Sequence, residues 1–237
     1  MGDGPPVNPW ARWRLNILLK RVLPSRVYVR YVGRHEQMSM NVWTHLAERL
    51  PATSTVLDIG AFHGEYALAA REVRSDLRIV SFEPNPESLR VLRTQTAGRN
   101  IEIVDAALGA TDGVAAFSLV GARSSLGVFE GEQSTEVRVA TLDSFDLGRV
   151  GLVKIDVEGA EVDVLAGGRE LFAEHRPVIL CEVLRDFRGE QLANVLPDGY
   201  AWLRIVENHG LVPSPVIDRR AWRDKNWLLI PVASAIR

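Results

Sequence analysis

Cysteine is almost absent from this sequence. Cys181 is the only one among 237 residues, and it lies in the apolar segment PVILCEV. One cysteine cannot form a disulfide within the chain or the multi-cysteine ligand set of a zinc site, so both are excluded. A reduced, cytoplasmic setting fits this composition, and we expect Cys181 itself to be a buried apolar side chain.

Net charge and long apolar runs are lacking as well. The chain has 28 Lys and Arg against 30 Asp and Glu, a formal net charge of −2, which provides no overall electrostatic attraction to nucleic acid. No apolar run approaches the roughly 20 residues that span a bilayer. Residues 1–9 also lack the basic start and apolar core of a signal peptide. We therefore expect a soluble protein with no nucleic-acid partner and no transmembrane segment.

A third absence is the dinucleotide-binding fingerprint G-x-G-x-x-G. The first glycine-containing loop begins at Asp58 and continues through Gly60, Ala61, Phe62 and Gly64, so Phe62 stands where the second glycine of the fingerprint belongs. Glycines still allow the backbone to approach a ligand, and the helix expected from Gly64 offers free N–H groups. The loop favours a ligand other than a pyrophosphate and leaves an NAD(P)-dependent oxidoreductase as the alternative.

From residue 55 onward, short apolar segments alternate with helical patterns. The strand-like segments are residues 55–60, 78–84, 101–108, 151–157, 177–183, 200–206 and 226–231, and an antiparallel excursion is expected at 114–120 and 136–142. Strands separated by helices indicate βαβ units in an α/β fold, with a mostly parallel sheet covered by helices on both faces. Ligands bind such sheets at the carboxyl ends of the strands.

The first 50 residues differ from the rest and are expected to form an N-terminal tail and helical extension to a main domain at 51–237. Residues 10–23 have the apolar spacing of an amphipathic helix with a basic face, and a second helical pattern spans 36–50. A lid or a homodimer contact is the favoured interpretation of the first helix. A peripheral membrane contact is the alternative, although four positive residues are few for stable attachment.

Acidic residues follow the first two strands of the main domain. Asp58 ends the first strand, and Glu83 ends the second, 83 − 58 = 25 residues later. An acid at the second position can accept both hydroxyls of an adenosine ribose. Glu83 also precedes a helix that begins after Pro84, where acids are favoured by the helix dipole, so the two roles are compatible.

The third and fourth strands continue this pattern. Asp105 and Ala106 end the third and are placed near an adenine ring, and Asp156 and Glu158 end the fourth. A ligand with a ribose, an adenine and a positive centre accounts for an acid at each of these strand ends. S-adenosylmethionine (SAM), with its sulfonium, is such a ligand.

Asp156 and Glu158 have three interpretations. If the strand continues, alternate residues point to the same side, and two close carboxylates leave one with a raised pKa that suits a general base. The same pair suits a Mg²⁺ ion, and Lys154 offers an internal ion pair instead. Glu182, at the end of the next strand, is expected in the same cleft. Glu161 falls in the first turn of a helix, where dipole stabilisation predicts a structural role.

The motifs resemble those of one known family. VLDIGAFHGEY, SFEPNPESLRVL, IVDAALGATDG, SSLG, VATLDSF, LVKIDVEGAEVDVLAGG, PVILCEV and NWLLIP follow one another, over about residues 36 to 231, as in the FkbM-type SAM-dependent methyltransferases. The resemblance implies a class I, Rossmann-like methyltransferase fold with a seven-stranded sheet. It also implies methyl transfer to a hydroxyl of a sugar, a glycoside or a polyketide-type natural product.

The resemblance also implies residue roles. The cofactor-binding residues would be Asp58, Gly60, Ala61, Phe62, Gly64, Glu83, Pro84, Asp105, Ala106, Ser125 and Asp156, and the catalytic residues Asp156, Glu158 and Glu182. One departure is that Phe62 and His63 stand where the family usually has Asn and an aliphatic residue. A non-catalytic, methyltransferase-like binding module remains a further alternative to the enzyme.

Overall fold

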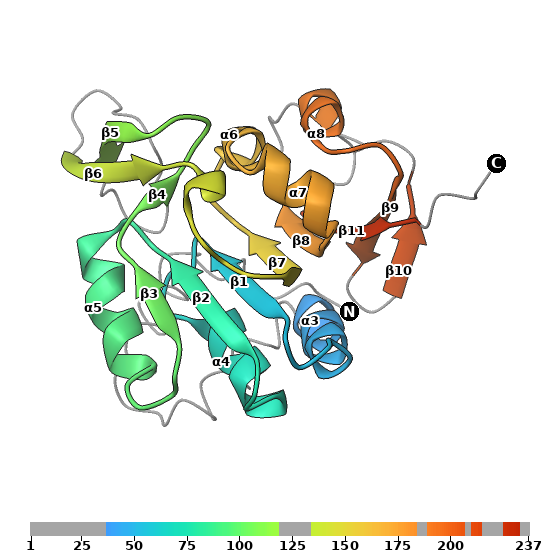
Figure 1. The fold of residues 1–237 in the computed structure, drawn as a ribbon, viewed down its shortest axis with the longest axis horizontal. Helices are drawn as coiled ribbons and strands as arrows, with labels where there is room; N and C mark the ends of the chain where they lie inside the picture. The colour runs from blue at the N-terminus through green and yellow to red at the C-terminus, as the bar shows by residue number, and fades with distance from the viewer. Residues whose placement is uncertain (1–36, 119–133, 184–188, 207–209, 215–224, 233–237) are drawn as a thin grey trace, which may run out of the picture. The chain divides into compact units, whose positions relative to one another are not determined.

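The computed structural model describes residues 37–118, 134–183, 189–206, 210–214 and 225–232 (Figure 1). The expected helix at 10–23 and Ser125 lie outside this set. The chain divides into two units, Met1–Gln37 and Met38–Arg237, and both sheets belong to the second. The boundary expected between residues 50 and 51 stays a prediction. Among the described residues, no helix is both long enough and apolar enough to cross a membrane.

The main sheet has the strand order β10-β9-β11-β8-β7-β1-β2-β3 (Figure 1). Five neighbouring strands are parallel: β8 (Val178–Glu182), β7 (Val150–Ile155), β1 (Thr55–Ile59), β2 (Arg78–Phe82) and β3 (Glu102–Val104). The other three pair antiparallel: β11 (Asn226–Pro231), β9 (Tyr200–Val206) and β10 (Gly210–Pro213). The expected mostly parallel sheet is confirmed. Within the described residues it has eight strands rather than seven, because the four-residue strand β10 pairs with β9 and extends the edge.

A second, three-stranded sheet has the order β4-β6-β5 and consists of β4 (Ala107–Leu108), β5 (Gly113–Ser118) and β6 (Ser134–Ala140). β5 and β6 are antiparallel, which confirms the expected excursion. The segment 101–108, expected as one strand, is divided, because β3 pairs with β2 while β4 pairs with β6. Asp105 and Ala106 lie in the connection between the two sheets.

Helices cover both faces of the main sheet. They are α3 (Gln37–Glu48), α4 (Glu65–Val73), α5 (Pro86–Gln95), α6 (Glu161–Ala166), α7 (Arg169–His175) and α8 (Gly189–Val195), with a 3₁₀ turn at Leu142–Ser144. Alternate residues of a strand point to opposite faces. Accordingly, Val56 of β1 packs in a cluster with residues of α3 and α4, whereas Leu57 packs with residues of α6, α7 and α8. The expected helical cover on both faces is therefore confirmed.

The break between α6 and α7 has a packing cause. A Cβ on Gly167 would lie 2.0 Å from the carbonyl oxygen of Gly109, so only glycine allows this approach to the segment after β4. The first turn of α7 then takes its acceptors from elsewhere in the chain. The backbone N–H groups of Glu170 and Leu171 donate to the carboxylate of Asp143, at 3.0 and 2.9 Å. The N-cap residue of α7, Gly168, has no side chain that could accept these N–H groups, so the distant Asp143 accepts them instead.

Trp43 joins α3 to the helix that follows β1. Its side chain is fully buried, and its indole N–H donates to the carbonyl oxygen of Tyr66 at 2.9 Å. The two rings meet edge to face, with centroids 5.5 Å apart, a favourable geometry for aromatic pairs. Tyr66 belongs to α4, which begins directly after the loop at residues 60–64.

We expect Trp43→Ala to lower the free energy of unfolding by about 3–5 kcal/mol, because it leaves a large cavity and removes the hydrogen bond to the Tyr66 carbonyl group. Urea unfolding followed by circular dichroism measures this. Val114→Ala, at a side chain that is 69% exposed, is the matched control and should change stability by less than about 0.5 kcal/mol. Equal losses in the two variants would contradict the anchoring role of Trp43.

Candidate active site

Three carboxyl groups lie at the carboxyl ends of three adjacent parallel strands. Asp58 belongs to β1, Glu83 follows β2 and Asp156 follows β7. We call them the strand-end acids. Asp58 and Glu83 are almost fully buried, and the side chain of Asp156 is 30% exposed. The sheet thus brings together acids that are 25 and 73 residues apart in the sequence (83 − 58 and 156 − 83).

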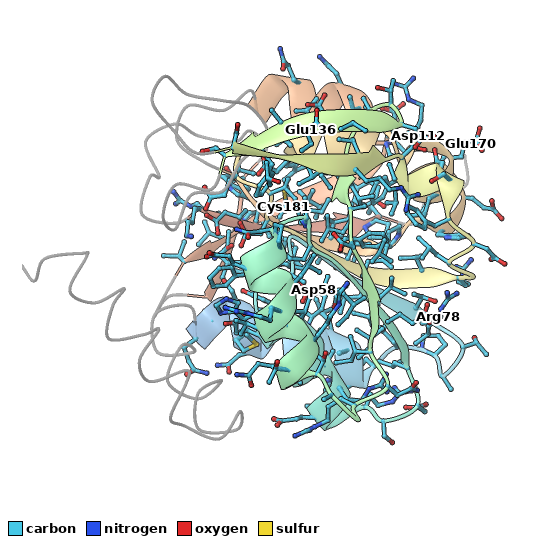
Figure 2. All side chains as sticks on the ribbon, turned by 90° about the vertical axis from the view of Figure 1, so that its left-hand side faces the viewer. Asp58, Arg78, Asp112, Glu136, Glu170 and Cys181 are labelled. Carbon is cyan, nitrogen blue, oxygen red and sulfur yellow. The ribbon has the colours of Figure 1, made fainter. Side chains whose placement is uncertain are left out.

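Asp58 is held in the interior of the unit (Figure 2). Its Oδ2 accepts the backbone N–H of Ala67, in α4, at 3.1 Å. Its Oδ1 has no hydrogen-bond partner among the described residues and lies 3.7 Å from Lys154 Nζ. Burial raises the pKa of Asp58 to about 6, and the nearby ammonium of Lys154 opposes that rise. One oxygen of this buried acid therefore lacks a hydrogen-bond partner among the described residues and faces the ammonium of Lys154.

The loop after β1 is shaped by its two glycines. Gly60 has φ +73°, and a Cβ there would lie 1.8 Å from the carbonyl oxygen of Asp156. Gly64 has φ +87°, and a Cβ there would lie 2.6 Å from a methyl group of Leu92. Packing against backbone requires glycine at position 60, whereas at position 64 it is the positive φ that favours glycine. The backbone N–H groups of Gly60 and Ala61 donate to the carbonyl oxygen of Phe82 at 3.0 Å, which ties the loop to the end of β2.

Glu83 connects this loop to the start of α5. Its Oε2 accepts the backbone N–H of Phe62 at 2.7 Å, and its Oε1 accepts that of Asn85 at 2.9 Å. Burial raises the pKa of Glu83 to about 7, against the effect of these two hydrogen bonds. Asn85, not Glu83, is the N-cap of α5, because its side chain accepts the N–H of Glu87. The capping role considered for Glu83 therefore belongs to Asn85, two residues further on and beyond Pro84.

Phe62 has an uncommon backbone conformation. Its φ is +50°, in the left-handed region that bulky residues rarely adopt. Its ring is 41% exposed and stacks on the ring of His63, with centroids 3.7 Å apart. The backbone N–H donates to the buried carboxylate of Glu83 while the ring lies at the surface. The hydrogen bond to Glu83 therefore holds the turn.

Lys154 is buried among the strand-end acids. Its Nζ lies 3.2 Å from Asp156 Oδ2 and donates to the carbonyl oxygen of Gly60 at 2.9 Å. It also lies 5.2 Å from the centre of the Tyr66 ring. Burial lowers the pKa of Lys154, but the carboxylates of Asp156 and Asp58 outweigh it and raise the pKa above its ordinary value. The internal ion pair considered from the sequence is therefore present. A site role for Asp156 stays a prediction.

The chain turns sharply after β7. The strand ends at Ile155, and Glu158 and Gly159 have φ values of +52° and +112°. The strand alternation that would place Asp156 and Glu158 on the same side therefore does not continue. Glu161 closes the turn, because its fully buried Oε1 accepts the N–H of Gly159 at 3.0 Å. This bond agrees with the structural role expected for Glu161, and burial raises the pKa of its carboxyl group.

Glu182, at the end of β8, has a partner that the sequence did not indicate. Both of its oxygens accept hydrogen bonds from Lys225 Nζ, at 2.6 and 2.7 Å. Lys225 directly precedes β11, and its carbonyl oxygen accepts the N–H of Val183 at 2.8 Å. The pair therefore fastens the end of β8 to the start of β11. The catalytic role of Glu182 stays a prediction. Both oxygens of this carboxylate already accept hydrogen bonds from Lys225.

A family model for the methyltransferase FkbM domain matches residues 58–212, which include all three strand-end acids. The chain belongs to the FkbM methyltransferase family. The resemblance inferred from the motifs is thereby confirmed, and so is the class I methyltransferase fold.

The individual proteins that resemble this chain have low sequence identity to it. The crystal structure of methyltransferase FkbM from Methylobacillus flagellatus KT has 21% sequence identity and a TM-score of 0.52, over 76% of this chain and 44% of that chain. Release factor glutamine methyltransferase of Mycolicibacterium smegmatis is 29% identical over 82 residues, which are 35% of this chain and 29% of that protein. The chain thus matches less than half the length of either relative. Aeropyrum pernix fibrillarin with bound SAM has 15% identity and a TM-score of 0.44, over 79% of this chain and 76% of that chain.

The two residues expected near the adenine ring differ in their exposure. Ala106 is buried beside the end of β3, whereas the Asp105 side chain is 59% exposed and lies 3.5 Å from Arg93. Exposed pairs of this kind contribute little to stability.

In the part of the chain that the structure describes, no group of three His, Cys, Asp or Glu side chains could hold a metal ion. Mg²⁺ therefore has no support here.

Sequence reasoning missed the central position of Lys154 and gave no sign of Tyr66 or Lys225. The signal for Lys154 was available, because a lysine between Val153 and Ile155 is in a run of buried strand residues. A buried ammonium needs acidic partners. No comparable signal exists for Lys225, which pairs with an acid 43 residues away.

Gly60→Ala should lower the free energy of unfolding by roughly 3 kcal/mol or more, since it combines backbone strain with a clash against Asp156. Gly98→Ala is the matched control. Gly98 has a similar φ of +72°, but nothing lies within 4 Å of the added Cβ, so only strain of about 1 kcal/mol is expected. Urea unfolding measures both, and equal losses would contradict the close approach of the two loops.

Proposed function

We propose that this protein is a SAM-dependent O-methyltransferase that acts on a hydroxyl group of a sugar, a glycoside or a polyketide-type alcohol. The observation that carries the proposal is the group of strand-end acids, Asp58, Glu83 and Asp156, in a member of the FkbM family. The acceptor class is supported by the resemblance of the motifs, because the site itself offers only general hydrogen-bond acceptors for a hydroxyl.

The residues fit the cofactor at two points. Asp58 Oδ1 is buried without a hydrogen-bond partner among the described residues, which suits a donor on a bound ligand. Each oxygen of Glu83 accepts one backbone N–H, and a carboxylate oxygen has a second lone pair for a ribose hydroxyl. SAM supplies an activated methyl group on a positively charged sulfur, a charge that suits an acidic site.

The proposed cofactor roles follow the order of the strands. Asp58 and the loop at 60–64 hold the methionine end, Glu83 and Pro84 the ribose, and Asp105 and Ala106 the adenine. Ser125, assigned to the same cofactor, lies outside the described residues. Phe62 takes part through its backbone, whose N–H orients Glu83.

Alignment of the acceptor should contribute more than proton removal. Positioning of reactants can provide roughly 7–11 kcal/mol, whereas a general base gives about 10²- to 10⁴-fold. Asp156 already has one oxygen paired with Lys154, so we assign it to orienting the acceptor hydroxyl. Glu158, placed in the turn after β7, is then the candidate base.

Calorimetric titration with S-adenosylhomocysteine (SAH) and, in parallel, with NADH tests the cofactor. Saturable binding of SAH alone is the expected result, and a screen of glycosides and polyketide alcohols would follow. Binding of NADH alone would overturn the methyltransferase proposal in favour of the oxidoreductase. Binding of neither ligand would favour a non-catalytic binding module.

Glu83→Ala should weaken SAH binding by roughly 100-fold, because hydrogen bonds to a charged group contribute about 1.5–3 kcal/mol each. The ribose hydroxyls donate to the ionised carboxylate, and the pKa of Glu83 is about 7. Wild-type affinity should therefore rise between pH 6 and pH 8, and the variant should lose that part of the rise. Glu102→Ala, at an exposed acid on β3, is the control for calorimetry. Unchanged SAH affinity in Glu83→Ala would remove the ribose assignment.

Asp156→Asn and Glu158→Gln should both leave SAH affinity within about threefold of wild type. Both should lower the rate of methyl transfer, and Glu158→Gln should lower it by about 10²-fold or more if Glu158 is the base. Single-turnover rates with an acceptor from the screen measure this. Asp163→Asn, at an exposed position of α6, should be neutral. Full activity in both site variants would exclude these two acids from the mechanism.

A further inference from the structure

We propose that Lys154 is a positioning residue, which keeps Asp58 ionised at neutral pH and holds the loop after β1 against the turn after β7. This inference rests on the proposed function for its consequence, cofactor binding. The contacts of Lys154 and the ionisation of Asp58 can be measured in the protein without any ligand.

The position of Lys154 follows from strand register. Lys154 of β7 is paired with Asp58 of β1 in the parallel ladder, and paired residues of neighbouring strands project to the same face of a sheet. On that face, α4 contributes Tyr66, whose ring lies under the ammonium at 5.2 Å. The lysine therefore reaches the strand ends from within the packed interior, with its side chain only 6% exposed.

The contacts of Lys154 connect two separate segments. It donates to the Gly60 carbonyl oxygen at 2.9 Å, in the loop after β1, and lies 3.2 Å from Asp156 Oδ2, after β7. The same segments touch directly, because Gly60 packs against the carbonyl oxygen of Asp156. One buried ammonium thus sets the relation between a loop proposed to hold the cofactor and an acid proposed to orient the acceptor.

The charges near Asp58 come from β7 and the turn after it, from α4 and from the end of β2. Lys154 of β7 favours its ionised form, while Glu65 of α4 and Asp156 after β7 disfavour it. Glu83, after β2, also interacts with Asp58. Lys154 in turn feels Asp156, Asp58 and, on β8, Glu182.

Close carboxylates raise one another's pKa. Without the lysine, Asp58 would therefore take up a proton near neutral pH. A neutral Asp58 would no longer attract the ammonium group at the methionine end, which SAM and SAH both carry.

The test is a ¹³C NMR titration of the aspartate carboxyl groups in the full chain, with Asp58→Asn used to assign the Asp58 signal. In Lys154→Met, the pKa of Asp58 should rise by roughly 1–3 units, the range expected for loss of an opposite charge, and Lys154→Arg should reduce that rise. Lys225→Met removes a lysine that pairs with Glu182 instead and should not change it. An unchanged Asp58 pKa in folded Lys154→Met would overturn the proposal.

SAH affinity provides a second readout. Lys154→Met should bind SAH about tenfold more weakly at pH 7 and recover part of the loss at pH 9, whereas a merely structural defect would weaken binding equally at both pH values. Failure of the wild-type protein to bind SAH would refute the proposed function, and the NMR result would still decide the role of Lys154.

If Lys154→Met does not fold, Asp156→Asn decides the question. Removing Asp156 removes a negative neighbour and leaves the ammonium to Asp58, so the Asp58 pKa should fall below the wild-type value. No fall in a folded Asp156→Asn variant would overturn the proposal.

Discussion

The buried ammonium of Lys154 is the interaction on which the geometry of the site depends. An isolated charge is too costly to bury, and a buried charge persists only with partners that replace water. Lys154 has Asp156, Asp58 and the Gly60 carbonyl group around it. The carboxylate of Asp156, directly after the apolar strand β7, is thus explained in part by the lysine that this strand buries.

Backbone contact makes the strand ends a single structure. The carbonyl oxygen of Asp156 occupies the space that a side chain at Gly60 would need, and the N–H of Asp156 donates to Ile59 at 3.0 Å. Glu83 joins the same loop to α5 through Phe62 and Asn85. Movement of any one of these segments therefore requires movement of the others. A site built in this way keeps its acids at fixed separations, as alignment of two reactants requires.

Much of the fold was predictable because its signals are local. The alternation in β1 distributes Val56 and Leu57 to opposite faces, and the parallel sheet follows from strands separated by helices. The strand β10 was missed because four residues are too few to show a period. The turn at Glu158 was also missed, since residues 151–157 were predicted as one strand and a glutamate rarely adopts a positive φ. The pair of Glu182 and Lys225 depends on tertiary contact that no local pattern carries.

Phe62 adopts a backbone conformation that its own side chain disfavours. Its left-handed backbone costs about 1–3 kcal/mol, and its charge-assisted hydrogen bond to Glu83 contributes about 1.5–3 kcal/mol. The two effects are similar in size, so the turn is stable without help from the ring. Asparagine or glycine would adopt this conformation more readily, so the backbone conformation alone does not favour phenylalanine. The ring stacks on that of His63, with centroids 3.7 Å apart, and the strain of the backbone is offset by the bond from its N–H to Glu83.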